Sequence, residues 1–193
     1  MDVDTVREFV SDIGDEADRL TRMSEKLLSL TRFHPDEGSD CEITYFRPTI
    51  ERVRRMLSTA ADMACVELRT EIITDSSILI MEDDLYQIIF NLVENAIKYN
   101  CPDGLVDLVV GKRGGEVYIC VEDTGIGIPQ DDLPHIFSRF YRVDKARSRA
   151  SGGSGLGLYL VSCIAKQHGM RTRVSNTANG VCFQLLWGAE EMS

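Results

Sequence analysis

The chain has 193 residues, 44% of them hydrophobic, which is enough for one full domain with a packed core and an appendage. Its formal net charge of −10 argues against nucleic-acid binding, because a surface that follows phosphates needs an excess of lysine and arginine. The six cysteines include no CxxC pair, so no zinc or redox motif is expected. Most of them lie among apolar neighbours and are predicted to be small buried hydrophobes, in a reducing compartment.

The start of the chain, residues 1–7, is acidic where a signal peptide would be basic. No run of about 18 apolar residues is present, so no membrane span is expected in this chain. We therefore expect a cytoplasmic location. A larger parent protein anchored in the inner membrane stays compatible with that expectation.

Residues 1–33 are predicted to form a helix with an apolar seam that needs a partner helix. A bundle or a dimer is expected, although one helix packed on its own domain is the alternative. Residues 34–42 are polar and contain a proline, so they read as a linker before a domain over 43–193. The seam repeats every seven residues at Val6, Ile13, Leu20 and Leu27, and Phe9, Met23 and Leu30 add a second line.

The domain after the linker mixes helices with strands. A proline at the first turn of a helix, alternating apolar runs and an Asn-Gly turn mark its elements. The pattern predicts an α+β domain of two layers, with a largely antiparallel sheet covered by helices. The expected strands are 43–46, 65–73, 77–81, 106–110, 117–121, 171–175 and 181–187, and the expected helices are 48–63, 83–99 and 155–168.

The predicted helix 83–99 carries polar residues of an unusual kind opposite its apolar face. Asn91 and Asn95 are one turn apart, although asparagine is a poor helix former. Amide and carboxylate oxygens at this spacing suit Mg²⁺, and Glu94 lies between the two asparagines. Lys98, one turn further on, could reach a phosphate. An ordinary polar helix surface is the alternative.

Two glycine-rich segments follow later in the chain. The first, Asp123 to Pro129, comes directly after a strand and places a carboxylate at its end, although a simple turn is the alternative. The second, Gly152 to Leu158, opens a helix, where backbone N–H groups and the helix dipole favour an anion. Its glycines fit neither a Walker A loop nor GxGxxG.

A long segment with little periodicity joins the two glycine segments. It holds the aromatic residues Phe137, Phe140 and Tyr141. Aromatic anchors within a basic loop are typical of a lid that closes over an anion. A tethered surface loop with solvated charges is the alternative. The basic residues are Arg142, Lys145, Arg147 and Arg149.

Together, four segments in this order resemble the sensor histidine kinase family over residues 43–188. Residues 91–99 resemble its N box, 123–127 its G1 box, 136–142 its F box and 153–157 its G2 box. The resemblance implies the Bergerat-type ATP-binding fold, an α/β sandwich shared with Hsp90, gyrase B and MutL proteins. It also implies transfer of the γ-phosphoryl group of Mg-ATP to a histidine, and then to an aspartate of a response regulator.

The same resemblance implies roles for single residues. Asn91 and Asn95 would hold Mg²⁺, Asp123 would accept from the adenine amino group, and Glu94, Lys98 and Arg142 would act in catalysis. The nucleotide would contact Asn91, Asn95, Lys98, Tyr99, Asp123, Gly125, Gly127, Ile128, Phe137, Phe140, Arg142, Gly153, Ser154, Gly155, Leu156, Gly157 and Leu158.

Residues 15–32 resemble the second helix of the family's dimerisation and phosphotransfer domain. The first helix, which carries the phosphorylated histidine, is absent, so we expect an outside acceptor and a dimeric parent. His34, His135 and His168 lack the acceptor motif and are predicted to be surface histidines. The alternatives are an ATP-binding regulatory module without phosphotransfer, or a related ATPase or serine kinase of the anti-sigma type.

Overall fold

The computed structural model describes residues 41–74, 76–143 and 154–188. The predicted helix 1–33, most of the linker and Gly153 lie outside the described residues. Within the described part of the chain, no helix is both long and apolar enough to cross a membrane.

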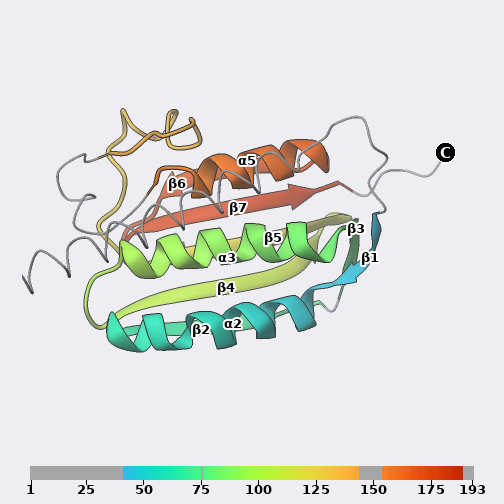
Figure 1. Cartoon of the computed structure of the whole chain (residues 1–193), viewed down its shortest axis with the longest axis horizontal. Coiled ribbons are helices and arrows are strands. Elements are labelled where there is room, and N and C mark those ends of the chain that lie inside the picture. The colour runs from blue at the N-terminus through green and yellow to red at the C-terminus, as the bar shows by residue number, and fades with distance from the viewer. Residues whose placement is uncertain (1–40, 75, 144–153, 189–193) are drawn as a thin grey trace, which may run out of the picture.

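The centre of the domain is a five-stranded sheet in the order β2-β4-β5-β7-β6. Strands β2 and β4 pair in parallel, and the other neighbours pair antiparallel. A separate antiparallel pair, β1-β3, lies at one end of the domain (Figure 1). The bounds are β1 Glu42–Tyr45, β2 Val66–Ile72, β3 Ser77–Ile80, β4 Gly104–Arg113, β5 Glu116–Asp123, β6 Arg171–Asn176 and β7 Val181–Trp187.

Three helices of the described residues cover one face of this sheet and form the second layer (Figure 1). They are α2 (Phe46–Met63), α3 (Glu82–Lys98) and α5 (Gly157–Gln167). The predicted α+β fold of two layers is confirmed. Most boundaries moved by only a few residues, and the hairpin strands β4 and β5 are longer than the apolar runs that predicted them.

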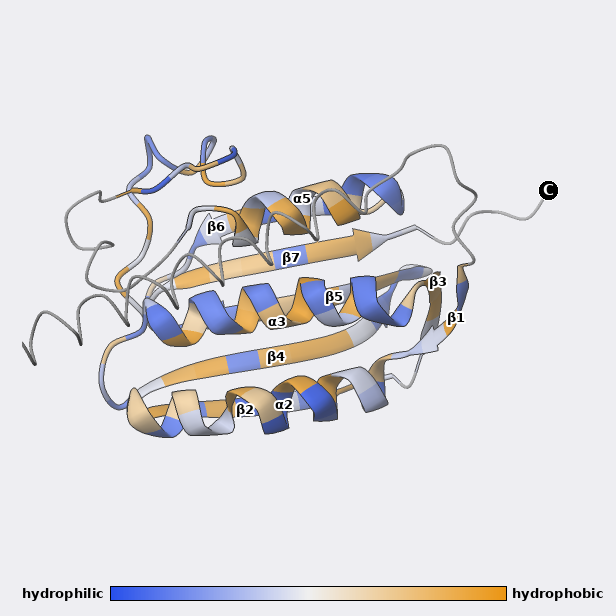
Figure 2. Ribbon diagram, viewed as in Figure 1, coloured by the Kyte–Doolittle hydropathy of each residue, from blue (hydrophilic) through white to orange (hydrophobic). Residues whose placement is uncertain are grey.

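The core lies between the two layers. Strand β5 alternates, so Val117, Ile119 and Val121 are buried toward the helices. Helix α3 buries a broad face, with Leu85 and Ile88 fully inaccessible to solvent. Apolar residues run along β4 and β7 beneath the helices in Figure 2. Truncating one such core side chain costs about 2–5 kcal/mol.

The connections bring several element ends to the same end of the domain. Helix α3 finishes there, β5 finishes there, and α5 starts there after the segment 124–143 (Figure 1). The β6–β7 turn lies beside them, because Asn176 pairs with Val181 and Asp123 pairs with Val181 across β7. The segments that resemble the family's boxes therefore meet at one end of the sheet.

Candidate functional site

Asn91 lies on α3 in an unexpected environment. The helix pattern placed it on the polar side, but its side chain is buried. Helix α5 begins against it, since a Cβ on Gly157 would lie 2.8 Å from Asn91 Oδ1. Its Nδ2 donates to the carbonyl of Gln87 at 2.7 Å, and its Oδ1 has no hydrogen-bond partner within the described part of the chain. The alternative of an ordinary polar helix surface does not hold for Asn91, because periodicity does not show what packs on a helix flank.

The last turn of α3 presents Glu94, Asn95 and Lys98, all partly exposed. The Lys98 Nζ lies 5.4 Å from the centre of the Tyr99 ring. Burial raises the pKa of Tyr99, Arg142 opposes that rise with its positive charge, and Glu94 adds to it. These electrostatic effects show that Arg142 lies near the end of α3 although it belongs to the later segment.

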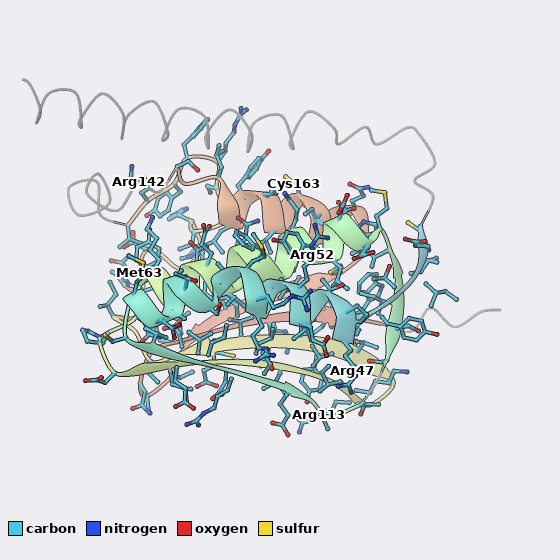
Figure 3. The ribbon with its side chains drawn as sticks, turned by 60° about the horizontal axis from the view of Figure 1, so that its bottom comes forward. Arg47, Arg52, Met63, Arg113, Arg142 and Cys163 are labelled. Carbon is cyan, nitrogen blue, oxygen red and sulfur yellow. The ribbon has the colours of Figure 1, made fainter. Side chains whose placement is uncertain are left out.

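Arg142 itself is partly buried, and its Nε and Nη2 atoms have no hydrogen-bond partner among the described residues. Figure 3 shows it at the same end of the molecule as Met63, the last residue of α2. A guanidinium group that is buried without an acceptor is costly, so the arrangement favours an anionic ligand.

Asp123 ends β5 and is only 5% exposed. Burial raises its pKa, and the backbone N–H groups of Gly125 and Val181 oppose that rise. The Gly125 N–H donates to Asp123 Oδ1 at 2.9 Å. The carboxylate is thus fixed in place with part of its acceptor capacity still available.

Gly125 has no room for a side chain. A Cβ there would overlap the carbonyl oxygen of Tyr99 and approach Asp123 Oδ1. The next residue, Ile126, donates its N–H to the same Tyr99 carbonyl at 3.2 Å. The loop after β5 is therefore packed against the C-terminal end of α3, which brings residues of both segments together.

Asn176, at the end of β6, was missed by sequence reasoning. Its Oδ1 accepts from the Ile128 N–H at 2.9 Å, and its Nδ2 donates to the Ile128 carbonyl at 2.6 Å. Gly127, just before, has a φ of +73°, which glycine adopts at little cost. Asn176 thereby fixes Gly127 and Ile128, and no local motif could have identified it.

Asn100 and Thr124 form a further hydrogen-bond network at this end of the domain, which the sequence motifs did not predict. The Thr124 hydroxyl donates to Asn100 Oδ1 at 3.1 Å and accepts from the Leu105 N–H at 2.8 Å. The Asn100 Nδ2 group donates to the Leu105 carbonyl at 3.0 Å. This network joins the end of α3, the start of β4 and the end of β5.

The described part of the predicted lid is anchored by aromatic residues. Phe137 packs edge-on against Phe183 of β7, with ring centres 6.3 Å apart. Tyr141 donates its hydroxyl to Asp132 within the segment. Phe140 is 48% exposed and has a φ of +62°, which costs a non-glycine residue energy. Of the two phenylalanines in this segment that were predicted to contact the nucleotide, Phe137 packs on the core and Phe140 is largely exposed.

The second glycine segment leads directly into α5. Gly155 has a φ of +68°, and its carbonyl accepts from the Phe140 N–H at 3.1 Å. A Cβ on Gly155 would crowd the Tyr141 carbonyl, so the lid and the helix start are in close contact. Leu156 is buried and Leu158 packs against the core, whereas Ser154 is partly exposed. Both leucines therefore pack into the protein where α5 starts.

His168 lies at the opposite end of α5 and was predicted to be a surface histidine. Its side chain is 4% exposed and lies 2.8 Å from Asp84 Oδ2, so it is not a surface histidine. His135 is exposed in the lid segment and lies near the Tyr141 ring. His34 lies outside the described residues.

The donor set fits a nucleotide with a bound divalent cation. Asn91 Oδ1 is a buried oxygen without a partner, which is a ligand type that Mg²⁺ accepts. Beside it, α5 starts without a capping side chain, which leaves backbone N–H groups for an anion. Arg142 adds two buried guanidinium nitrogens without a described partner, and Asp123 adds a buried carboxylate.

Comparisons with known proteins agree with this geometry. The family described as histidine kinase-, DNA gyrase B- and HSP90-like ATPase matches residues 80–190. The sensor-like histidine kinase SenX3 of Mycolicibacterium smegmatis is 39% identical over 187 residues, which cover 95% of this chain and 48% of SenX3. The chain therefore spans about half the length of the curated relatives it matches.

Two solved structures share the fold. Full-length ShkA in complex with AMPPNP superposes with a TM-score of 0.73 at 24% identity, covering 94% of this chain and 38% of ShkA. Histidine kinase ThkA in complex with the response regulator protein TrrA superposes with a TM-score of 0.69 at 21% identity, covering 97% and 52%. The chain belongs to the histidine kinase-, DNA gyrase B- and HSP90-like ATPase family, and it carries the catalytic ATP-binding domain of a sensor histidine kinase.

Proposed function

We propose that the chain binds Mg-ATP at the end of the sheet where α3 and β5 finish and α5 begins. As the catalytic part of a sensor histidine kinase, it transfers the γ-phosphoryl group to a histidine supplied from outside this chain. The described histidines support an outside acceptor, because His168 is buried against Asp84. His135 lies in the lid segment near the Tyr141 ring and lacks the family's acceptor motif.

One observation carries the proposal. Among the described residues, Asn91 Oδ1 and Arg142 Nε and Nη2 are buried without a hydrogen-bond partner, as is Thr49 Oγ1 on α2. Asn91 and Arg142 both lie at this end, the first against the start of α5 and the second near Tyr99. Native proteins pair nearly all buried polar groups, so such atoms indicate a polar ligand.

Each end of the nucleotide has a fitting set of residues. Asp123 would accept from the adenine amino group, with Gly125 and Gly127 leaving room for the base. Asn91 and Asn95 would hold Mg²⁺, which supplies charge neutralisation at the phosphates. Lys98 and Arg142 would bind the phosphoryl oxygens.

The N-terminal end of α5, from Ser154 to Leu158 with Gly155 and Gly157, would offer backbone N–H groups to the triphosphate. Gly153 would extend this contact. Transfer would then depend mainly on positioning and on neutralising charge around the group in flight. Glu94, beside Asn95, would polarise the accepting histidine.

The onward partner would be a response regulator. The ThkA structure contains a response regulator protein, and this chain shares its fold. We therefore propose that the phosphoryl group passes from the histidine to an aspartate of such a protein. The family match favours transfer over a module that only binds ATP.

A nucleotide titration with and without Mg²⁺ tests the metal assignment. Asn95→Ala should weaken Mg-ATP binding by at least about tenfold, because one well-placed metal contact contributes more than about 1.4 kcal/mol. Gln87→Ala is the matched control, since it removes an amide from the same helix two turns away. Unchanged affinity in Asn95→Ala would contradict the proposed metal ligand.

Phosphotransfer needs its own test. A separate phosphotransfer domain from a SenX3-type kinase is incubated with the chain and ATP, and acid-labile phosphate on that domain is measured. Phosphorylation that is lost in Asn95→Ala and kept in Gln87→Ala is the expected result. ATP binding without any transfer would favour the regulatory-module alternative.

A further inference from the structure

Two cysteines lie side by side in the middle of the sheet. Cys120 belongs to β5 and Cys182 to β7, and their Sγ atoms are 3.2 Å apart. In the strand register, Cys120 lies opposite Gln184 and Cys182 lies opposite Glu122, so the cysteines are diagonal neighbours. Both are free thiols. Sequence spacing could not show this pair, because 62 positions separate its members.

The thiol pair lies on the sheet face away from the helices. The neighbouring residues Val121 and Phe183 point into the core, so Cys120 and Cys182 point the other way. None of the described helices covers that face (Figure 1). Cys120 is half-buried and Cys182 is 8% exposed, which leaves access for a small oxidant.

The two thiols are chemically unequal. The hydrogen bond between them lowers the pKa of Cys182 and raises that of Cys120. Burial works against ionisation of both groups. Because the thiolate is the reactive form, Cys182 is the better nucleophile and Cys120 the proton donor beside it.

We propose that Cys120 and Cys182 form a reversible disulfide when the chain meets hydrogen peroxide. The Cys182 thiolate attacks one peroxide oxygen, an S–O bond forms and the O–O bond breaks. The released hydroxide takes up the proton that Cys182 lost on ionising and becomes water. Cys120 sulfur then attacks Cys182 sulfur, the S–S bond forms, and the S–O bond breaks. The second hydroxide leaves with the Cys120 proton as water. The two sulfurs are oxidised and the peroxide is reduced.

The bond would change the geometry of the strand pair. Diagonal neighbours are normally about 7–8 Å apart at Cα, which is at or beyond the limit for a relaxed disulfide. The two sulfurs, 3.2 Å apart in the reduced chain, must also approach by about 1 Å to form the bond, and we expect β5 and β7 to shift locally as they do. Strained disulfides of this kind are easily reduced, which suits a reversible modification better than a permanent cross-link.

The shift would reach the base-binding end of the site. Asp123 follows Cys120 by three residues and pairs with Val181, directly before Cys182. There is no spare room here, since a Cβ on Gly180 would overlap the Asp123 carbonyl oxygen. A movement of β7 against β5 therefore displaces Asp123 and lowers nucleotide affinity. This consequence rests on the proposed function of Asp123, whereas formation of the disulfide does not.

The test uses the full chain, reduced and then treated with hydrogen peroxide. Peptide mapping should find a cross-link between the peptides that contain Cys120 and Cys182, with recovery of both thiols after dithiothreitol. ATP affinity should fall by about fivefold or more in the oxidised chain, within the usual range of coupling between sites. Cys120→Ser and Cys182→Ser should each abolish the cross-link and the loss of affinity.

Cys163→Ser is the matched control and should behave like the unmodified sequence. Cys163 is a half-buried thiol on α5, on the helical side of the sheet in Figure 3. Absence of the 120–182 cross-link under conditions that oxidise other thiols would overturn the site. A cross-link with unchanged ATP affinity would overturn its coupling to the nucleotide. A reduced chain that fails to bind ATP would instead refute the proposed function, while the cross-link remains measurable.

Discussion

Asp123 is a buried carboxylate at the end of β5 whose pKa differs from that of a free side chain. Its burial raises the pKa of the carboxyl group, and two backbone N–H groups only partly offset that cost. The ionised carboxylate is therefore less stable in the fold than in water. An amino group that donates to it would lower the pKa again, so ligand binding and ionisation of Asp123 favour each other.

This coupling predicts a pH dependence of ATP affinity. Affinity should fall as the pH decreases through the raised pKa of Asp123, which lies above its ordinary value of 3.8. At higher pH the carboxylate is already ionised, so affinity levels off. Calorimetric titration across the acidic range measures the curve. Glu71→Gln, an exposed carboxylate on β2, should leave the curve unchanged, whereas Asp123→Asn should flatten it at low affinity.

Gly125 is a second residue whose substitution should have a clear effect, because a single added Cβ atom would overlap the backbone. Gly125→Ala forces a Cβ onto the Tyr99 carbonyl, which belongs to the backbone and cannot rotate away. We expect a loss of about 1–3 kcal/mol in the free energy of unfolding, together with weaker ATP binding. Gly188→Ala is the matched control, because a Cβ there meets nothing within 4 Å. Equal behaviour of the two variants in thermal unfolding and ATP titration would refute the tight contact.

The sequence predicted Asp123 and Gly125 because they form a local motif at the end of a strand. It did not predict the burial of Asn91, since the flank of a helix is covered by a partner that periodicity does not identify. It also placed His168 at the surface, although Asp84, 84 positions away, holds it. Contacts between distant segments depend on topology, and the spacing of residues along one element does not encode them.

At the scale of elements, β6 supports the loop that follows β5. The paired hydrogen bonds from Asn176 to Ile128 join the last residue of β6 to the segment after β5. Neither element would hold this loop alone. The correct prediction of β6 and β7 from their alternation did not include this role, because it arises only when the β6–β7 turn lies beside β5.

Asn176→Ala should therefore weaken ATP binding without unfolding the domain. Loss of the two hydrogen bonds should lower the free energy of unfolding by about 1–2 kcal/mol, and hydrogen exchange should increase in residues 126–129. Asn179→Ala, in the exposed turn of the same strand pair, is the control. If Asn176→Ala keeps full affinity and protection, Asn176 has no supporting role.

The opposite end of the helical layer depends on a buried pair. His168, which follows α5, contacts Asp84 in the first turn of α3. The His168 ring also lies beside the Trp187 ring, with 6.2 Å between the ring centres. A buried polar pair that loses one partner leaves the other unsatisfied. The pair thus ties two helices together at a distance from the nucleotide end.

Asp84→Ala should lower the free energy of unfolding by about 1–3 kcal/mol and leave the ATP affinity of the folded protein unchanged. Asp83→Ala, whose side chain is 91% exposed, should do neither. Chemical denaturation and ATP titration of both variants measure the two effects. A large loss of ATP affinity in Asp84→Ala would mean that the two ends of the domain are coupled.

For the whole molecule, the fold was predicted more completely than the site. Hydropathy periodicity and turn residues gave the two layers and nearly every strand, because these signals are local. The order β2-β4-β5-β7-β6, with one parallel pair, was not predicted and is what brings the glycine segments together. The family resemblance supplied the roles that local chemistry left open.

The central claim is that the buried side-chain atoms of Asn91 bind the metal of Mg-ATP and those of Arg142 bind its phosphates. Titration of the full chain with ATP, in the presence and absence of Mg²⁺, tests it most directly when Asn91→Ala and Gln87→Ala are measured beside it. We predict tight binding with Mg²⁺, weaker binding without it, and little effect of Mg²⁺ in Asn91→Ala only. Binding that ignores both Mg²⁺ and the loss of Asn91 would contradict the account.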